Sequence, residues 1–96
     1  MQSTLEKFEH WYHLQCDGVW EHNNSVKIYG IDNPGWAVVI TLEDTKWENL
    51  QLDTGLVEVS EDDWYNIKMS NFIFKGIGDA KKLNFILSFF LSIVLE

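Results

Sequence analysis

The stretch from Leu83 to Val94 constrains the fold most, because its helical period leaves almost no polar face. Six apolar side chains recur at the spacing of a single helix face: Leu83, Ile86, Leu87, Phe90, Ile93 and Val94. Phe85 and Phe89 lie on the back of the same helix. A helix that is apolar over most of its circumference must be buried on two sides, by the rest of the chain or by a second subunit. We expect a cover from within the chain, supplied by Trp47, Leu50 and Leu52.

The 96 residues, 46% of them apolar, suit one globular domain spanning residues 1–96 with a single hydrophobic core. Fifteen acidic residues, seven lysines and no arginine give a formal net charge of −8. Such a chain repels phosphate and lacks the side chain that grips phosphate best, which argues against nucleic-acid binding. The same charge suits a basic protein partner, although it can also serve solubility alone.

The cysteine content and the hydropathy of the two ends bear on the cellular compartment. Cys16 is the single cysteine, so no internal disulfide can form and nothing indicates an oxidising environment. Residues 1–4 are polar and lack the apolar core of a signal peptide. The most hydrophobic stretch, residues 85–95, is about half as long as a membrane span requires. We therefore expect a cytoplasmic protein that does not bind membranes.

The first helix has a clear start signal. Ser3-Thr4-Leu5-Glu6 matches a capping box, in which the serine and glutamate side chains satisfy free amides of the first turn. Leu5, Phe8, Tyr12 and Cys16 then follow helical spacing, which predicts an apolar stripe with a buried Cys16 thiol facing the sheet. Gly18 is well placed to end the helix.

After residue 25 the side-chain period changes to two, which predicts one strand over residues 26–31 and another over residues 36–42. Between them, Asn33-Pro34-Gly35-Trp36 places proline second and glycine third in a turn, a pattern typical of type II. That turn requires a left-handed conformation at Gly35. The two strands are expected to form an antiparallel hairpin.

Residues 56–59, 64–69 and 72–75 predict further strands, joined by a polar turn at residues 60–63 and a hairpin tip at Ser70-Asn71. Gly76-Ile77-Gly78 is expected to break the strand pattern, and Asp79 to cap the final helix. Residues 43–55 show no clear period. The predicted fold class is α+β, an antiparallel sheet of about four to five strands flanked by an N-terminal and a C-terminal helix, in the order α-β-β-β-β-α.

Two clusters are the most specific feature of the sequence. They read W-Y-x3-C-D-G-x-W-E-H from Trp11 to His22 and I-D-N-P-G-W from Ile31 to Trp36. Together with Asp63-Trp64, Phe72-x-Phe74, Gly76-x-Gly78 and the leucine-rich final helix, they resemble the immunity protein 53 family of bacterial polymorphic toxin systems. The resemblance implies a small intracellular antidote that binds and silences a toxin, without catalysis and without a cofactor. A nuclease, whose substrate groove is basic, is a toxin of suitable charge.

The polar and aromatic residues of these clusters have two interpretations. They form either an acidic and aromatic rim that binds a basic partner, or the caps, turn contacts and core packing of the fold itself. The partner-binding candidates are Asp17, Trp20, Glu21, His22, Asp32, Asn33 and Trp36. A metal site is not expected, because Cys16 and His10 point to different sides of one helix.

Two other functions stay open at the level of sequence. A small hydrolase or ligand-binding enzyme could use Cys16 as nucleophile and His22 as base, oriented by Glu21 or Asp17, although no familiar motif surrounds them. A homo-oligomeric scaffold, such as a homodimer through the final helix, could bury Phe85 and Phe89. Gly76-x-Gly78 before a helix is weak evidence for phosphate binding, since Asp79 would repel the phosphate.

Overall fold

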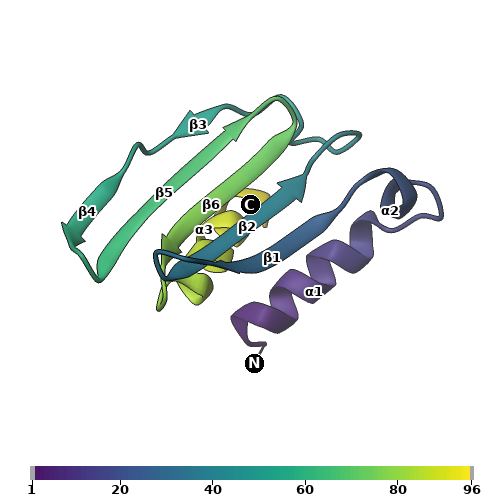
Figure 1. Cartoon of the computed structure of the whole chain (residues 1–96). Helices are drawn as coiled ribbons and strands as arrows, with labels where there is room; N and C mark the ends of the chain where they lie inside the picture. Colours follow the sequence, from purple (N-terminus) through teal and green to yellow (C-terminus); the bar gives the residue numbers. More distant parts are fainter. Residues whose placement is uncertain (1, 96) are drawn as a thin grey trace.

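A computed structural model describes residues 2–95 of the chain (Figure 1). Three helices and six strands follow one another in this order: α1 (Thr4–Gln15), α2 (Trp20–Asn23), β1 (Val26–Ile31), β2 (Gly35–Thr41), β3 (Leu52–Asp53), β4 (Val57–Ser60), β5 (Asp63–Ser70), β6 (Ile73–Asp79) and α3 (Leu83–Val94). The five predicted strands correspond to β1, β2, β4, β5 and β6. The short elements α2 and β3 fall where the sequence pattern gives no period.

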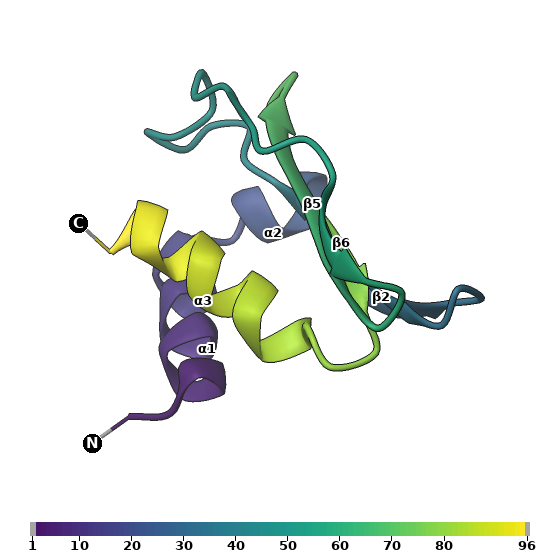
Figure 2. The same cartoon turned by 90° about the vertical axis from the view of Figure 1, so that its left-hand side faces the viewer.

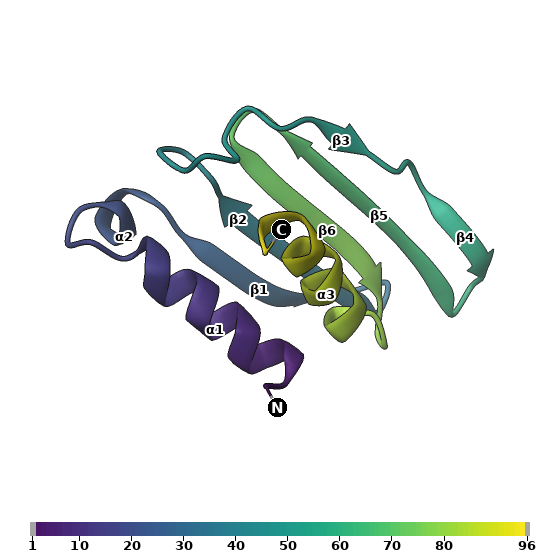
Figure 3. The same cartoon turned by 180° about the vertical axis from the view of Figure 1, so that it is seen from behind.

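The strands form one antiparallel sheet in the order β1-β2-β6-β5-β3, and β4 also pairs with β5. Helices α1 and α3 lie on the same face of this sheet (Figure 2). Seen from behind, α3 crosses β2 and β6, the two strands against which it packs most closely (Figure 3). The α+β class with an N-terminal and a C-terminal helix is therefore confirmed, and both helices cover one face only.

The start of α1 follows the capping-box prediction. The Ser3 hydroxyl accepts a hydrogen bond from the Glu6 amide at 3.1 Å, and the Glu6 carboxylate accepts one from the Ser3 amide at 3.1 Å. Two free amides of the first turn are thus satisfied by local side chains. The helix ends at Gln15, one residue before Cys16.

The predicted apolar stripe of α1 is wrong at three of its four positions. Phe8 is buried, but Leu5 is 56% exposed, Tyr12 is exposed and Cys16 is only half-buried. The reason is that α1 packs against α3 rather than the strands, so its buried face is centred on Phe8 and Trp11. The Cys16 thiol instead donates to the Tyr12 carbonyl at 3.3 Å, at the end of the helix.

The core lies between α3 and the sheet. Helix α3 buries five side chains, namely Ile86, Leu87, Phe90, Leu91 and Val94. They meet buried side chains of the three central strands, namely Val38, Ile40, Ile67, Met69 and Phe74. Phe90 also contacts Phe74 edge to face, with ring centroids 5.0 Å apart. The predicted core face of this helix is confirmed at four positions, and Leu91 joins it.

The expectation that Gly76 and Gly78 break the strand is wrong, because β6 runs through both to Asp79. The glycines instead let α3 approach the sheet closely. A Cβ at Gly76 would lie 2.5 Å from Cγ2 of Ile86, and one at Gly78 would lie 2.6 Å from Cβ of Lys82. The helix begins after Lys82, so Asp79 does not cap it as predicted.

The predicted cover of the second side of α3 by Trp47, Leu50 and Leu52 is not formed as a close packing. A hollow of about 410 Å³ lies between Leu50, Leu52 and Phe89 of α3, and Trp47 packs on Trp11 of α1. Phe85 is covered differently, by Tyr65 of β5, with ring centroids 4.6 Å apart. Because this cover is incomplete, Phe85 stays 38% exposed.

The type II turn predicted at residues 33–36 is also wrong. Gly35 is the first residue of β2 and is not among the glycines with a positive φ in the described chain. It has an extended conformation because it already pairs with Asp79 of β6. What requires glycine here is space, since a Cβ would collide with the Gly78 carbonyl of the neighbouring strand.

Gly35→Ala is therefore expected to lower the free energy of unfolding by about 1–3 kcal/mol, because β2 and β6 must separate to admit a methyl group. Gly30→Ala is the matched control, since a Cβ there meets only the Gly35 carbonyl oxygen, at an ordinary 3.8 Å. Urea denaturation of both variants checks this. Equal stability of the two would show that β2 and β6 do not approach as closely as described.

Candidate partner-binding site

The partner-binding residues predicted from sequence occupy two separate places. Asp17, Trp20, Glu21 and His22 belong to α2 and the turn before it, whereas Asp32 and Asn33 form the turn after β1 (Figure 1). Strand β1 runs between them, and six residues of strand span roughly 20 Å. The two clusters therefore do not form one continuous rim.

The first cluster mainly holds the chain between α1 and α2. The Asp17 carboxylate accepts hydrogen bonds from the amides of Trp20 and Val19, both at 2.9 Å, and these bonds lower the pKa of Asp17. The Glu21 carboxylate in turn accepts from the amides of Asp17 and Gly18. Gly18 has a φ of +93°, which glycine adopts without steric cost. The two carboxylates thus accept hydrogen bonds from backbone amides that have no carbonyl partner in this sharp turn.

Trp20 and His22 differ in accessibility. Trp20 is buried, contacts Trp11 edge to face at 6.1 Å and donates its indole N–H to the Glu43 carbonyl at 2.9 Å. His22 is exposed on the outside of α2. Within this cluster, His22 and Asp17 are exposed, and the Asp17 carboxylate is already bonded to backbone amides.

The second cluster lies at the other end of β1, beside an acidic surface. Asp32 and Asn33 are exposed, and Trp36 is half-buried. The Trp36 indole N–H donates to the Ala80 carbonyl at 3.0 Å. This bond ties the start of β2 to the connection between β6 and α3.

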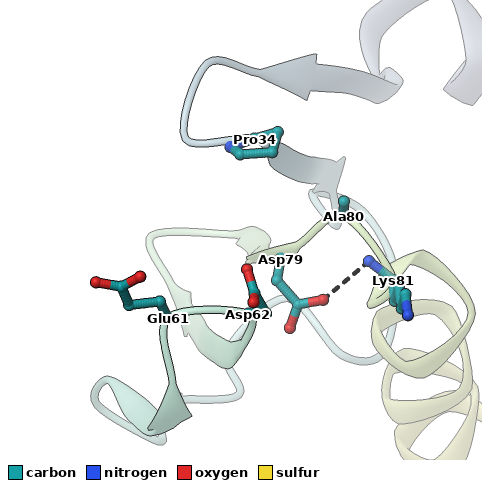
Figure 4. A pocket seen from close by; sticks show the side chains of 6 residues that line it. All are labelled: Pro34, Glu61, Asp62, Asp79, Ala80 and Lys81. Atoms are coloured by element: carbon teal, nitrogen blue, oxygen red, sulfur yellow. Dashed lines mark hydrogen bonds between the residues drawn. The ribbon is translucent and has the colours of Figure 1, made fainter.

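Two adjoining hollows open at this end of the sheet. One of about 200 Å³ lies between the β1–β2 turn, the β4–β5 turn and the β6–α3 connection (Figure 4). The other, of about 440 Å³, shares Glu61 and Asp62 with it. Together they form what we term the acidic groove, whose exposed lining residues include Asn33, Pro34, Glu58, Glu61, Asp62 and Lys81.

The inner wall of the acidic groove is held by the buried carboxylate of Asp79. It accepts hydrogen bonds from the Trp64 amide at 2.9 Å, the Lys81 amide at 2.8 Å and the Lys82 ammonium at 2.9 Å. Lys82 also pairs with Asp63 at 2.6 Å. Burial alone would raise the pKa of Asp79, but these hydrogen bonds and the Lys82 charge outweigh it and lower the pKa to about 2. The carboxylate is therefore ionised at neutral pH and fixes the meeting point of β5, β6 and α3.

The remaining charges make the groove anionic. Glu58, Glu61 and Asp62 are exposed in its lining, Asp32 is exposed next to Asn33, and Lys81 is the one exposed cation among the lining residues. In Figure 4 the carboxylate of Glu61 points away from the other labelled side chains. Such a surface attracts ammonium and guanidinium groups.

The sequence predicts a polar turn at residues 60–63, which contains Glu61 and Asp62, but does not place it beside Asn33. It does not identify Glu58 either, because the position of Glu58 depends on its pairing with Trp64 across β4 and β5. No local pattern encodes that pairing. The proximity of the two turns likewise arises from the sheet order, in which β2, β6 and β5 are neighbours.

The arrangement needed for a cysteine hydrolase is not present among residues 2–95. No hydrogen bond joins Cys16 to His22, and Glu21 is occupied by backbone amides. A hollow does lie near α2, but its lining contains none of these three side chains. In the same described range, no three His, Cys, Asp or Glu side chains gather as a metal site, and the helices are too short or too polar to cross a membrane.

The fold and the groove define a small α+β protein that presents an acidic surface at one end of its sheet. The family model described as immunity protein 53 matches residues 5–95, and the chain belongs to this family. The resemblance noted from the sequence clusters is thereby confirmed. No curated protein and no solved structure gave a significant match.

Proposed function

We propose that this immunity protein acts in the bacterial cytoplasm by binding a cognate toxin and neutralising it through stoichiometric occlusion. Membership of the immunity protein 53 family, over residues 5–95, is the observation that carries this proposal. Inhibition by occlusion needs a complementary surface and no catalytic group. A basic toxin, such as a nuclease with its substrate groove, is the partner that best suits a chain of net charge −8.

The acidic groove is the surface we propose for the toxin. Its exposed carboxylates, Glu58, Glu61 and Asp62, lie on a rigid frame made by the Asp79 and Lys82 contacts. Asp32 and Asn33, two of the residues predicted from sequence, stand on the adjoining turn. A preformed anionic surface raises the association rate by steering, and loses little entropy when the partner binds.

Replacing Glu61 and Asp62 together by lysine is expected to slow association with the cognate toxin on the order of tenfold at low salt, with a smaller change in dissociation. The matched control is Glu9→Lys with Glu43→Lys, which changes the net charge equally at exposed sites on α1 and near α2. Stopped-flow mixing at several salt concentrations measures both rates. Equal slowing by the two pairs would mean that overall charge, not the groove, steers the toxin.

A homodimer through α3 is a second candidate, because Phe85 is 38% exposed beside the half-buried Phe89. We expect the chain to be monomeric, since Tyr65 already packs on Phe85 and Phe89 is half-buried. Light scattering on the wild type and on Phe85→Ser with Phe89→Ser tests it. A wild-type dimer that the double substitution converts to a folded monomer would contradict this expectation.

A further inference from the structure

The sheet has one face that no helix of the described chain covers (Figure 2). Alternate side chains of a strand point to opposite faces, so the partners of the core residues point away from α1 and α3. Because Val38, Ile40 and Phe74 face the helices, Val39 and Lys75 face the other way. We call this second side the open face.

Three lysines form a row across the open face. The pairing of the strands places Lys27 of β1 opposite Val39, Val39 opposite Lys75 of β6, and Lys75 opposite Lys68 of β5. All three lysines are exposed. They therefore form a basic stripe perpendicular to the strands, which Val39 interrupts and which ends at Asp53 of β3, opposite Lys68.

This stripe is unusual in so acidic a chain. The long strands β1, β2, β5 and β6 carry two acids, Asp63 and Asp79, and both are bonded to Lys82. Within residues 2–95, no carboxylate lies within 4.0 Å of an ammonium group in the stripe. Asp53 of β3 lies opposite Lys68, but its carboxylate accepts a hydrogen bond from the Gly55 amide, so the three lysines of the stripe share one cross-strand acid.

The stripe also destabilises the isolated protein. Lys68 and Lys75 are directly opposite on neighbouring strands, and like charges in that position destabilise a sheet. The next row of side chains on the open face is apolar. In it, Tyr29 is 46% exposed and Ile77 is half-buried. Cationic groups next to partly exposed apolar groups match the rim and core of a protein interface.

We propose that the open face docks a protein segment rich in carboxylates. Its acidic side chains lie along Lys27, Lys68 and Lys75, and its apolar side chains pack on the row of Tyr29 and Ile77. The occupant is a protein rather than a nucleic acid, because the chain as a whole is anionic and has no arginine. This surface has the opposite sign to the acidic groove, so the inference goes beyond the toxin-binding proposal and does not depend on it.

The test is an NMR titration of the full chain with a short peptide of alternating glutamate and valine. We expect amide shifts confined to β1, β2, β5 and β6, and an affinity that falls about fivefold or more in Lys68→Gln with Lys75→Gln. Lys7→Gln with Lys46→Gln, which removes the same charge from exposed sites outside these strands, is expected to leave the affinity unchanged.

The same two double variants distinguish a loss of binding from a loss of folding. Removing the opposed lysines should leave the melting temperature unchanged or raise it, so lost binding cannot be blamed on unfolding. Absence of peptide binding, equal loss in both double variants, or a lowered melting temperature would overturn the proposal. So would tighter binding of single-stranded oligothymidylate than of the peptide, or shifts on the open face that depend on protein concentration alone. A negative result here leaves the charge-swap result at the acidic groove unaffected.

Discussion

Replacing Trp11 by alanine is expected to lower the free energy of unfolding by about 3–5 kcal/mol. Trp11 is 1% exposed and joins both long helices to the loop after β2. Its ring contacts four aromatic side chains at centroid distances between 4.8 and 6.2 Å, namely Phe8, Trp20, Trp47 and Phe90. Because domains of this size are commonly stable by only about 5–15 kcal/mol, the variant should be close to unfolding. Urea denaturation measures the loss.

Two substitutions on the same helix control this experiment. Trp11→Phe keeps an aromatic ring at the site and should cost clearly less than the alanine variant. Leu14→Ala removes a side chain that is 62% exposed, so it should change stability by less than about 0.5 kcal/mol. If Leu14→Ala proved as costly as Trp11→Ala, the buried face assigned to α1 would be wrong.

Replacing Asp79 by alanine is expected to cost about 3 kcal/mol at neutral pH. The substitution leaves the amides of Trp64 and Lys81 without their acceptor and removes one of the two carboxylates that bind Lys82. Asp63→Ala is the matched control, since Asp63 is half exposed and binds only the Lys82 ammonium through its side chain. It should cost less than about 1 kcal/mol.

The pH dependence of stability shows how much of the Asp79 contribution to the unfolding free energy comes from its charge and how much from its packing. The pKa of this group is lowered from 3.8 to about 2 in the folded protein, so its contribution is present above about pH 4 and is lost as the pH falls towards 2. The difference in unfolding free energy between wild type and Asp79→Ala should therefore shrink by on the order of 2 kcal/mol over that range. A difference that stays constant with pH would show that the Asp79 carboxylate is not held ionised by these contacts.

Local signals in the sequence predicted the local features of the fold. The capping box gave the start of α1 because both of its hydrogen bonds lie within four residues. The side-chain period of two predicted the strands of the central sheet. The face of α1 was not predictable in the same way, because Leu5 and Tyr12 offered an alternative stripe beside Phe8. Only the contact with Phe90 of α3 decides which face is buried.

The glycines and the acidic groove could not be predicted from the sequence, because both depend on tertiary contacts. The sequence predicts a turn at Gly35 and a strand break at Gly76 and Gly78, whereas all three are strand residues whose missing Cβ admits a neighbouring strand or helix. The sequence predicts one acidic and aromatic rim from the two clusters, between which nine residues separate His22 from Asp32. An extended strand turns that short separation into opposite ends of the sheet.

Stoichiometric occlusion is tested by titrating a candidate toxin, such as the product of an adjacent gene, with this immunity protein. We expect toxin activity to fall linearly to zero at one equivalent, and the two proteins to elute together as a one-to-one complex. Under the same conditions, the pair Glu61→Lys with Asp62→Lys should need longer mixing before inhibition is complete. Loss of toxin activity at a small fraction of one equivalent, or full inhibition without a stable complex, would contradict stoichiometric occlusion and favour a catalytic antidote.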